Sequence, residues 1–191
     1  MSVPEVVVFA EAEVPEALRV QVLDLQAAAF GDREPADRGP VHDPDLHPVS
    51  MLLIDGGTVV SALDVLGTHM AHAGQVWSVA GLSTVVTAKG RRRQGHGRTL
   101  VTAARAAIAR SGADLALFTS DPPLSLFYRS CGFEVLEGAV VVGGTAADPL
   151  RSDSLDKVTL VTFFSDRARA QAPAFAHTDL GLYPGAVDRL W

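Results

Sequence analysis

Residues 83–110 read STVVTAKGRRRQGHGRTLVTAARAAIAR. The stretch begins with β-branched residues typical of a strand, passes through a turn rich in glycine and arginine, and continues into an alanine-rich amphipathic helix predicted over 97–111. Glycines let backbone N–H groups approach a ligand, and a helix start carries a partial positive charge. The junction therefore predicts a binding site for a phosphate-bearing ligand.

Spacing decides which phosphate motif the turn can be. A nucleotide P-loop needs Lys followed by Ser or Thr after its second glycine, where this chain has His96 and Gly97. The dinucleotide fingerprint needs a third glycine where this chain has Leu100. Both motifs are excluded because the chain lacks a residue that each of them requires. Two interpretations remain, a different pyrophosphate-binding turn or a glycine-rich turn whose arginines are simply solvated.

The rest of the chain predicts an α+β fold with a mixed sheet. Asp55-Gly56-Gly57 and Ala73-Gly74 are hairpin signals that divide the apolar stretch between them into an antiparallel meander. The predicted order is a strand at 5–14, a helix at 15–30, an acidic proline-rich loop at 31–48, the meander at 49–88, the helix at 97–111, a strand at 113–120, a short helix at 124–131, two late strands at 133–144 and 156–165, and a mostly irregular tail at 166–191.

Composition excludes several classes of protein. The 191 residues carry a net charge of −6, so the basic turn is a local exception, which argues against general nucleic-acid binding and favours a cationic small substrate. No apolar run reaches the length of a membrane span, and no leader pattern opens the chain, so we expect a cytoplasmic protein. The single cysteine, Cys131, excludes an intrachain disulfide, and we expect no metal site.

Two motifs in the right order resemble the GNAT N-acetyltransferase superfamily. They are Arg92-x-x-Gly95-x-Gly97 after a strand, and Phe127-Tyr128-x-x-x-Gly132-Phe133 downstream. The resemblance implies a mostly antiparallel twisted sheet flanked by helices in three α/β/α layers. It implies one acetyltransferase domain at 1–165, with the tail packed on it near the acceptor, and acetyl-CoA as the cofactor.

The resemblance also assigns roles to residues. It makes Tyr128 the general acid and places Ser83 where many relatives carry a glutamate base, with Asp64, His69 or a tail carboxylate as substitutes. It gives Val85 the backbone N–H that stabilises the oxyanion. The cofactor-binding residues that it implies are Val85, Val86, Thr87, Arg92, Arg93, Gln94, Gly95, His96, Gly97 and Arg98.

A weaker resemblance to aminoglycoside 2'-N-acetyltransferases suggests where the amine binds. It rests on an acidic loop with Asp32 and Asp37 and on a chain end with Asp188 and Trp191, which would contact the substrate. Trp191 could equally be a packing latch. The expected function is acetyl transfer to a primary amine of a small molecule, an aminoglycoside or amino sugar among them. The alternatives are a protein amine acetyltransferase and a non-catalytic acyl-CoA-binding module, and a homodimer is an open option.

Overall fold

The computed structural model describes residues 3–31 and 41–191, and every structural statement below concerns these residues. The strands are β1 (Glu5–Ala10), β2 (Val49–Asp55), β3 (Thr58–His72), β4 (Gln75–Thr87), β5 (Leu115–Ser120), β6 (Glu134–Val135), β7 (Val140–Gly144), β8 (Pro149–Arg151), β9 (Val158–Phe163) and β10 (Asp179–Gly181). The α-helices are α1 (Glu16–Phe30), α2 (His96–Arg110), α3 (Ser125–Ser130) and α4 (Asp166–Gln171). Short 3-10 turns include η1 (Glu11–Glu13), η2 (Pro44–Leu46), η3 (Lys89–Arg91) and η6 (Ala172–Phe175).

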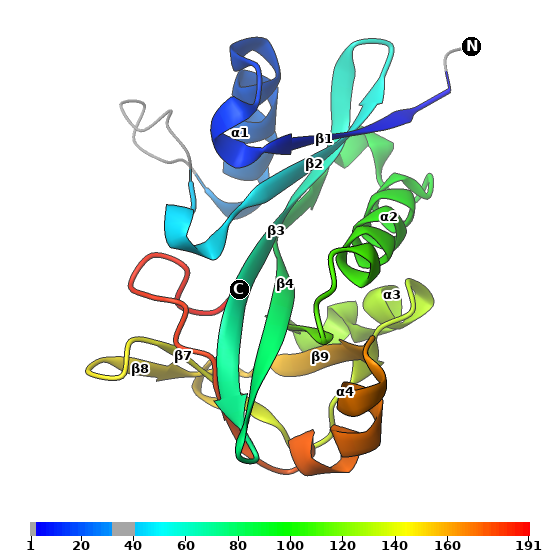
Figure 1. Cartoon of the computed structure of the whole chain (residues 1–191). Helices are drawn as coiled ribbons and strands as arrows, with labels where there is room; N and C mark the ends of the chain where they lie inside the picture. Colours follow the sequence, from blue (N-terminus) through cyan, green and yellow to red (C-terminus); the bar gives the residue numbers. More distant parts are fainter. Residues whose placement is uncertain (1–2, 32–40) are drawn as a thin grey trace.

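The main sheet is mixed and mostly antiparallel, as the sequence predicts. In the described residues it has seven strands in the order β1-β2-β3-β4-β5-β9-β6, of which only β4 and β5 run parallel (Figure 1). A second sheet joins β10, β7 and β8. The predicted fold class is therefore confirmed.

Alternation along the strands places helices on both faces of the sheet. Ala62 packs in a cluster with α1 residues, whereas its neighbour Leu63 packs in the larger core that contains Leu100 and Ile108 of α2. Successive strand residues point to opposite faces, so α1 and α2 cover opposite sides of the sheet (Figure 1). This arrangement gives the three layers that the family resemblance implies.

Both hairpin predictions of the meander are confirmed. Ala73 and Gly74 connect β3 to β4 with positive φ angles of 49° and 73°, the pattern of a type I′ turn. Gly56 and Gly57 also have positive φ and connect β2 to β3.

Strand β4 separates from β5 after Ala80 and contains a bulge a few residues later. Asp64 pairs with Ser83 and Ala62 pairs with Val86, so two residues of β4, Thr84 and Val85, face one residue of β3. Thr84 has a φ of 51°, a rare value for a β-branched residue. The two parallel strands pair only at residues 79–80 and 115–116 and diverge beyond them.

Two predictions about the C-terminal half are wrong. The stretch 133–144 is not one strand, because the chain turns at Gly138, which has a φ of 64°, and divides into β6 and β7 in different sheets. The tail, 166–191, is not mostly irregular either. It contains α4, η6 and β10, and Phe175 of η6 is fully buried against Trp77.

Candidate functional site

A groove of about 620 Å³ opens beside the end of β4 and the start of α2. It contains nine of the ten predicted cofactor-binding residues, Val85, Val86, Thr87, Arg92, Arg93, Gly95, His96, Gly97 and Arg98. The tenth, Gln94, does not line it and donates its amide to the Gly90 carbonyl instead. Tyr128, Phe127, Leu124, Arg91, Ala29 and Phe30 complete the wall.

The start of α2 presents free backbone donors to this groove. Gly95 is the N-cap residue with a left-handed φ of 87°, and no side chain among the described residues caps the helix. The Nε2 atom of His96 is buried and has no hydrogen-bond partner in the described part of the chain. A β-carbon on Gly97 would lie 3.0 Å from Thr87 Oγ1, so the turn approaches β4 closely at this glycine. The geometry is that of an anion-binding helix start.

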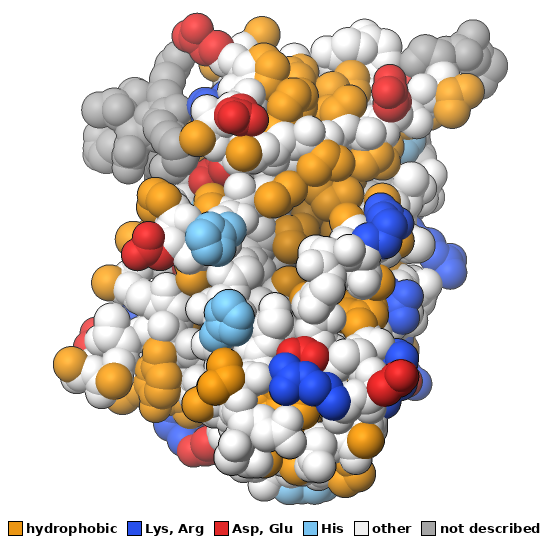
Figure 2. All heavy atoms as spheres, viewed as in Figure 1, with side chains coloured by type: hydrophobic (Ala, Val, Ile, Leu, Met, Phe, Trp, Pro, Cys, Tyr) orange, Lys and Arg blue, Asp and Glu red, His pale blue; other side chains and the backbone are white. Residues whose placement is uncertain are grey.

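Arginines surround this helix start. Arg92 donates to the Thr87 carbonyl at 3.3 Å, and Arg98 donates to the Ser130 carbonyl at 3.0 Å, so neither has a carboxylate partner of its own in the described chain. Arg91 differs, because its guanidinium pairs with Asp55 at 2.9 Å. Figure 2 shows Lys and Arg side chains along the edge of the molecule over α2 and α3. The groove is positively charged within an acidic protein.

Tyr128 lies at the apolar side of the groove. Its ring packs edge-to-face on Phe118 of β5, with centroids 5.0 Å apart, and the residue is 6% exposed. Burial, followed by the nearby Cys131 and Asp121, raises the pKa of Tyr128 to about 12, so the phenol keeps its proton at neutral pH. Tyr128 lines the groove beside Phe127 and Leu124. Burial also raises the pKa of the Cys131 thiol, as expected for a packing residue.

Ser83 and Asp64 face each other across β4 and β3. Ser83 does not line the groove. Asp64 is buried and accepts hydrogen bonds of 2.5 Å from Ser50 Oγ and from Thr84 Oγ1, the residue in the β4 bulge. Of the predicted substitutes for the base, Asp64 therefore lies close to the bulge, but both of its carboxylate oxygens already accept hydrogen bonds. His69 lies in β3, opposite Ser78, several residues from the bulge.

His42 is a site residue that the sequence analysis missed. Its side chain is 1% exposed and lies between two carboxylates, with Nδ1 2.6 Å from Asp188 Oδ1 and Nε2 3.3 Å from Asp64 Oδ2. Burial lowers the pKa of His42, but Asp188 and Asp64 outweigh it and raise that pKa to about 10. His42 is therefore an imidazolium at neutral pH. No spacing rule links residues 42, 64 and 188, so only the fold brings them together.

A family model confirms what this geometry suggests. Residues 13–136 match the model described as the acetyltransferase (GNAT) domain, which is well over half of the chain. The chain belongs to the GNAT acetyltransferases. The match covers the bulge, the glycine-arginine turn and Tyr128, and it ends before the tail. No curated protein sequence matches the chain.

Solved structures share the GNAT fold at low sequence identity. A probable N-acyltransferase from Enterococcus faecalis has a TM-score of 0.59 at 18% identity, over 71% of this chain and 33% of that one. A GCN5-related N-acetyltransferase from Kribbella flavida has a TM-score of 0.55 at 21% identity, over 70% of this chain and 34% of that one. An acyl-CoA N-acyltransferase from Pseudomonas aeruginosa has a TM-score of 0.58 at 16% identity, over 83% of this chain and 99% of that one. The matched region thus spans about a third of the first two proteins and nearly all of the third.

The tail of this GNAT protein reaches the gap between β4 and β5. Trp191 is 4% exposed, and its indole N–H donates to the Leu117 carbonyl of β5 at 2.8 Å. The Trp191 backbone oxygen accepts from the Thr119 N–H at 3.0 Å, and the indole lies against Gly81 of β4. Asp188 is held by His42 and by the Asp43 N–H at 3.0 Å. Of the predicted substrate residues, Trp191 thus contacts β4 and β5 where these strands separate, and Asp188 contacts His42. Asp32 and Asp37 lie outside the described residues.

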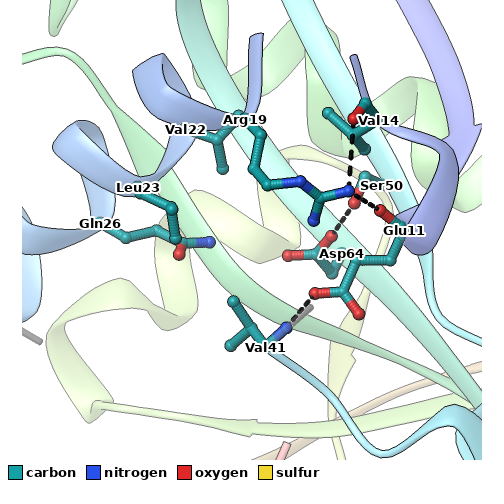
Figure 3. A pocket seen from close by; sticks show the side chains of 9 residues that line it. All are labelled: Glu11, Val14, Arg19, Val22, Leu23, Gln26, Val41, Ser50 and Asp64. Carbon is teal, nitrogen blue, oxygen red and sulfur yellow. Dashed lines mark hydrogen bonds between the residues drawn. The ribbon is translucent and has the colours of Figure 1, made fainter. Parts of the chain in front are cut away.

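A small cavity of about 20 Å³ lies next to Asp64, with room for about one water molecule. Figure 3 shows the side chains that line it, among them Glu11 of η1, Arg19 and Gln26 of α1, and Ser50 of β2. Glu11 accepts from the Val41 N–H, and burial raises the pKa of its carboxyl. The described residues contain no group of three or more His, Cys, Asp or Glu side chains placed to hold a metal ion. None of their helices is long and apolar enough to cross a bilayer.

Proposed function

We propose that this GNAT protein transfers an acetyl group from acetyl-CoA to a primary amine of a small molecule. One observation carries the proposal. A single groove joins an uncapped helix start, ringed by arginines, to the protonated hydroxyl of Tyr128 and to the bulged end of β4. The helix start can bind an anion and the tyrosine hydroxyl can donate a proton, and both line the same groove.

The residues present fit coenzyme A. A volume of about 620 Å³ is within the range of sites for cofactor-sized ligands. Backbone N–H groups of residues 95–98 would hold the pyrophosphate, and Arg92, Arg93 and Arg98 would supply positive charge. The buried, unpartnered Nε2 of His96 is a further polar atom that a ligand could satisfy. Gln94 turns away, so we leave it out of the cofactor site.

When bound, acetyl-CoA supplies the thioester and leaves as a thiol. Tyr128 would hold a proton at its hydroxyl for the departing sulfur, since its pKa of about 12 keeps the phenol protonated. Val85 follows the bulge residue Thr84, where regular pairing is interrupted, and we assign its N–H to the developing oxyanion. Its side chain already lines the groove.

Within residues 3–31 and 41–191, the predicted positions of the base provide no free carboxylate. Asp64 accepts hydrogen bonds from Ser50 and Thr84 and forms an ion pair with His42. His42 cannot accept the proton either, because its raised pKa keeps it protonated. Ser83 carries a hydroxyl, which is a poor proton acceptor, and it does not line the groove, so we assign the removal of the amine proton to solvent. An amine that is partly neutral at the working pH would then react best.

We place the acceptor on the side of the sheet where the tail docks. In this proposal residues 1–165 form the catalytic domain, and the tail provides Trp191 and Asp188 as part of the acceptor wall. The net charge of −6 favours a cationic amine, and aminoglycosides and amino sugars are the compounds to test first.

A thiol-release assay tests the function. Acetyl-CoA is mixed with a panel of aminoglycosides, amino sugars, polyamines and a lysine-containing peptide, and free thiol is measured with and without each amine. The proposal expects amine-dependent release from a small molecule. Release with the peptide alone would identify a protein acetyltransferase, and calorimetric binding of coenzyme A without turnover on any amine would identify a non-catalytic module.

A further inference from the structure

Three segments far apart in the sequence converge on His42. Its imidazole lies between Asp64 of β3 and Asp188 of the tail. The second oxygen of Asp188 accepts the Asp43 N–H, and Glu11 accepts the N–H groups of Val41 and His42. The segment 41–43 is therefore fixed from both sides, by η1 and by the tail.

We propose that His42 is a positioning residue that pins the tail to the bulged part of the sheet. The connection runs from Thr84 in the β4 bulge to Asp64, from Asp64 to His42, and from His42 to Asp188. We call His42, Asp64 and Asp188 the ionic staple. Three residues after Asp188, Trp191 lies between Gly81 and Leu117. The staple thus sets where the tail meets the gap between β4 and β5.

The staple depends on its charge. Removing one partner of a buried ion pair leaves the other charge buried without compensation, which is strongly destabilising. Without the imidazolium, the carboxylates of Asp64 and Asp188 would both be buried with no cation between them. The tail can relieve this by moving Asp188 into water, whereas Asp64 cannot leave the middle of β3. Loss of His42 should therefore release the tail and leave the sheet intact.

The charges around His42 support an imidazolium there. The groups that face it are Asp64 from β3, Asp188 from the tail and Glu11 from η1, while Arg19 of α1 lies beyond Glu11 and donates to its carbonyl. The two paired carboxylates raise the pKa of His42 against the opposing effect of burial. Two carboxylates contact the imidazole itself, and Glu11 adds a third acidic group at the backbone N–H of His42, a surrounding that favours the charged ring.

The role in the reaction rests on the proposed function. If the tail forms part of the acceptor wall, the staple controls the binding of the amine and leaves coenzyme A unaffected, since none of its residues lines the groove. Its variants should then raise the Michaelis constant for the amine, with little change in that for acetyl-CoA.

Hydrogen exchange measured by mass spectrometry tests the staple without any substrate. The reporters are the tail amides of Leu182, Tyr183 and Gly185, which donate to Val142 and Gly144 carbonyls, and the Thr119 amide that donates to Trp191. In His42→Asn these amides should exchange at least about 10-fold faster, while the β5–β9 amides stay protected. The matched control is His47→Asn, since His47 is exposed in the same segment and its left-handed φ of 48° suits asparagine.

Asp188→Asn provides a second variant in case His42→Asn does not fold. It should release the same amides, and the double variant should release them no more than the stronger single variant, because both remove one interaction. Exchange within about twofold of the unsubstituted protein in both single variants would overturn the staple. The kinetic effect is separate. If no amine is acetylated, the proposed function fails while the exchange result still decides the staple.

Discussion

Substituting Gly81 with alanine tests whether Trp191 fills the gap between β4 and β5. A β-carbon at Gly81 would lie 2.6 Å from Trp191 Cδ1 and 2.7 Å from the Leu117 carbonyl oxygen, and it would also meet the indole nitrogen. Carbon atoms in contact are about 3.5–4.0 Å apart, so the indole must move by about 1 Å or leave, and the strands must also shift apart at the Leu117 carbonyl. Either movement breaks its hydrogen bond to Leu117.

The cost follows from what Trp191 loses. The hydrogen bond contributes about 1 kcal/mol, and removing a buried aromatic side chain costs about 3–5 kcal/mol. Alanine itself is favoured over glycine in a strand by about 0.5–1 kcal/mol. Because the indole can be displaced without being fully expelled, we expect Gly81→Ala to lower the free energy of unfolding by about 2–4 kcal/mol.

Urea unfolding followed by circular dichroism measures this loss. The matched control is Gly67→Ala in the neighbouring strand, where an added β-carbon would meet nothing closer than 3.8 Å. That variant should be neutral or slightly more stable. In a Trp191→Ala background, Gly81→Ala should cost at least about 1 kcal/mol less than in the unsubstituted protein. Equal stability of Gly81→Ala and Gly67→Ala would refute the placement of Trp191.

Three further predictions concern the groove and the staple. Tyr128→Phe should lower kcat by about 100-fold or more, since it removes the proposed acid, while the calorimetric affinity for coenzyme A stays the same; unchanged kcat would remove Tyr128 from the mechanism. Gly95→Glu should weaken coenzyme A binding at least about 10-fold, because it adds a negative charge and backbone strain at a φ of 87°. The control, Gly90→Glu, adds the same charge in open space and should have a much smaller effect. Equal losses of affinity in the two variants would contradict the anion site. The pKa of His42 is raised from 6.5 to about 10 in the folded state, so the stabilisation by its charge is complete below pH 6.5 and is lost as the pH rises toward 10. The free energy of unfolding in urea should therefore fall over that range in the unsubstituted protein and not in His42→Asn. A parallel pH profile in both proteins would argue against an imidazolium at this position.

Residue spacing grouped the residues that line the groove, whereas it gave no indication of the contacts around Asp188 and Trp191. The turn around Gly95 and Gly97 depends on local backbone geometry, which residue spacing records, and nine of the ten predicted residues line one cavity. The β4 bulge was not predicted, because the apolar pattern of STVVTA does not reveal an extra residue in the pairing with β3.

His42 shows why the remaining part of the site was missed. It is a histidine in an acidic, proline-rich loop, where the composition predicts exposure, and the tertiary fold buries it between residues that are distant in sequence. The same holds for the tail. Its sequence has no long apolar period, yet Phe175 and Trp191 anchor it to the core. Long-range contacts of this kind have no signal in a single sequence.

We propose that one groove supports acetyl transfer from acetyl-CoA to a small amine. The most direct measurement is amine-dependent release of free thiol from acetyl-CoA, carried out in parallel with the unsubstituted protein and Tyr128→Phe. We expect release that saturates with a small-molecule amine and that falls by about 100-fold in the variant, at equal coenzyme A affinity. Tight binding of coenzyme A with no release on any amine of the panel would contradict it.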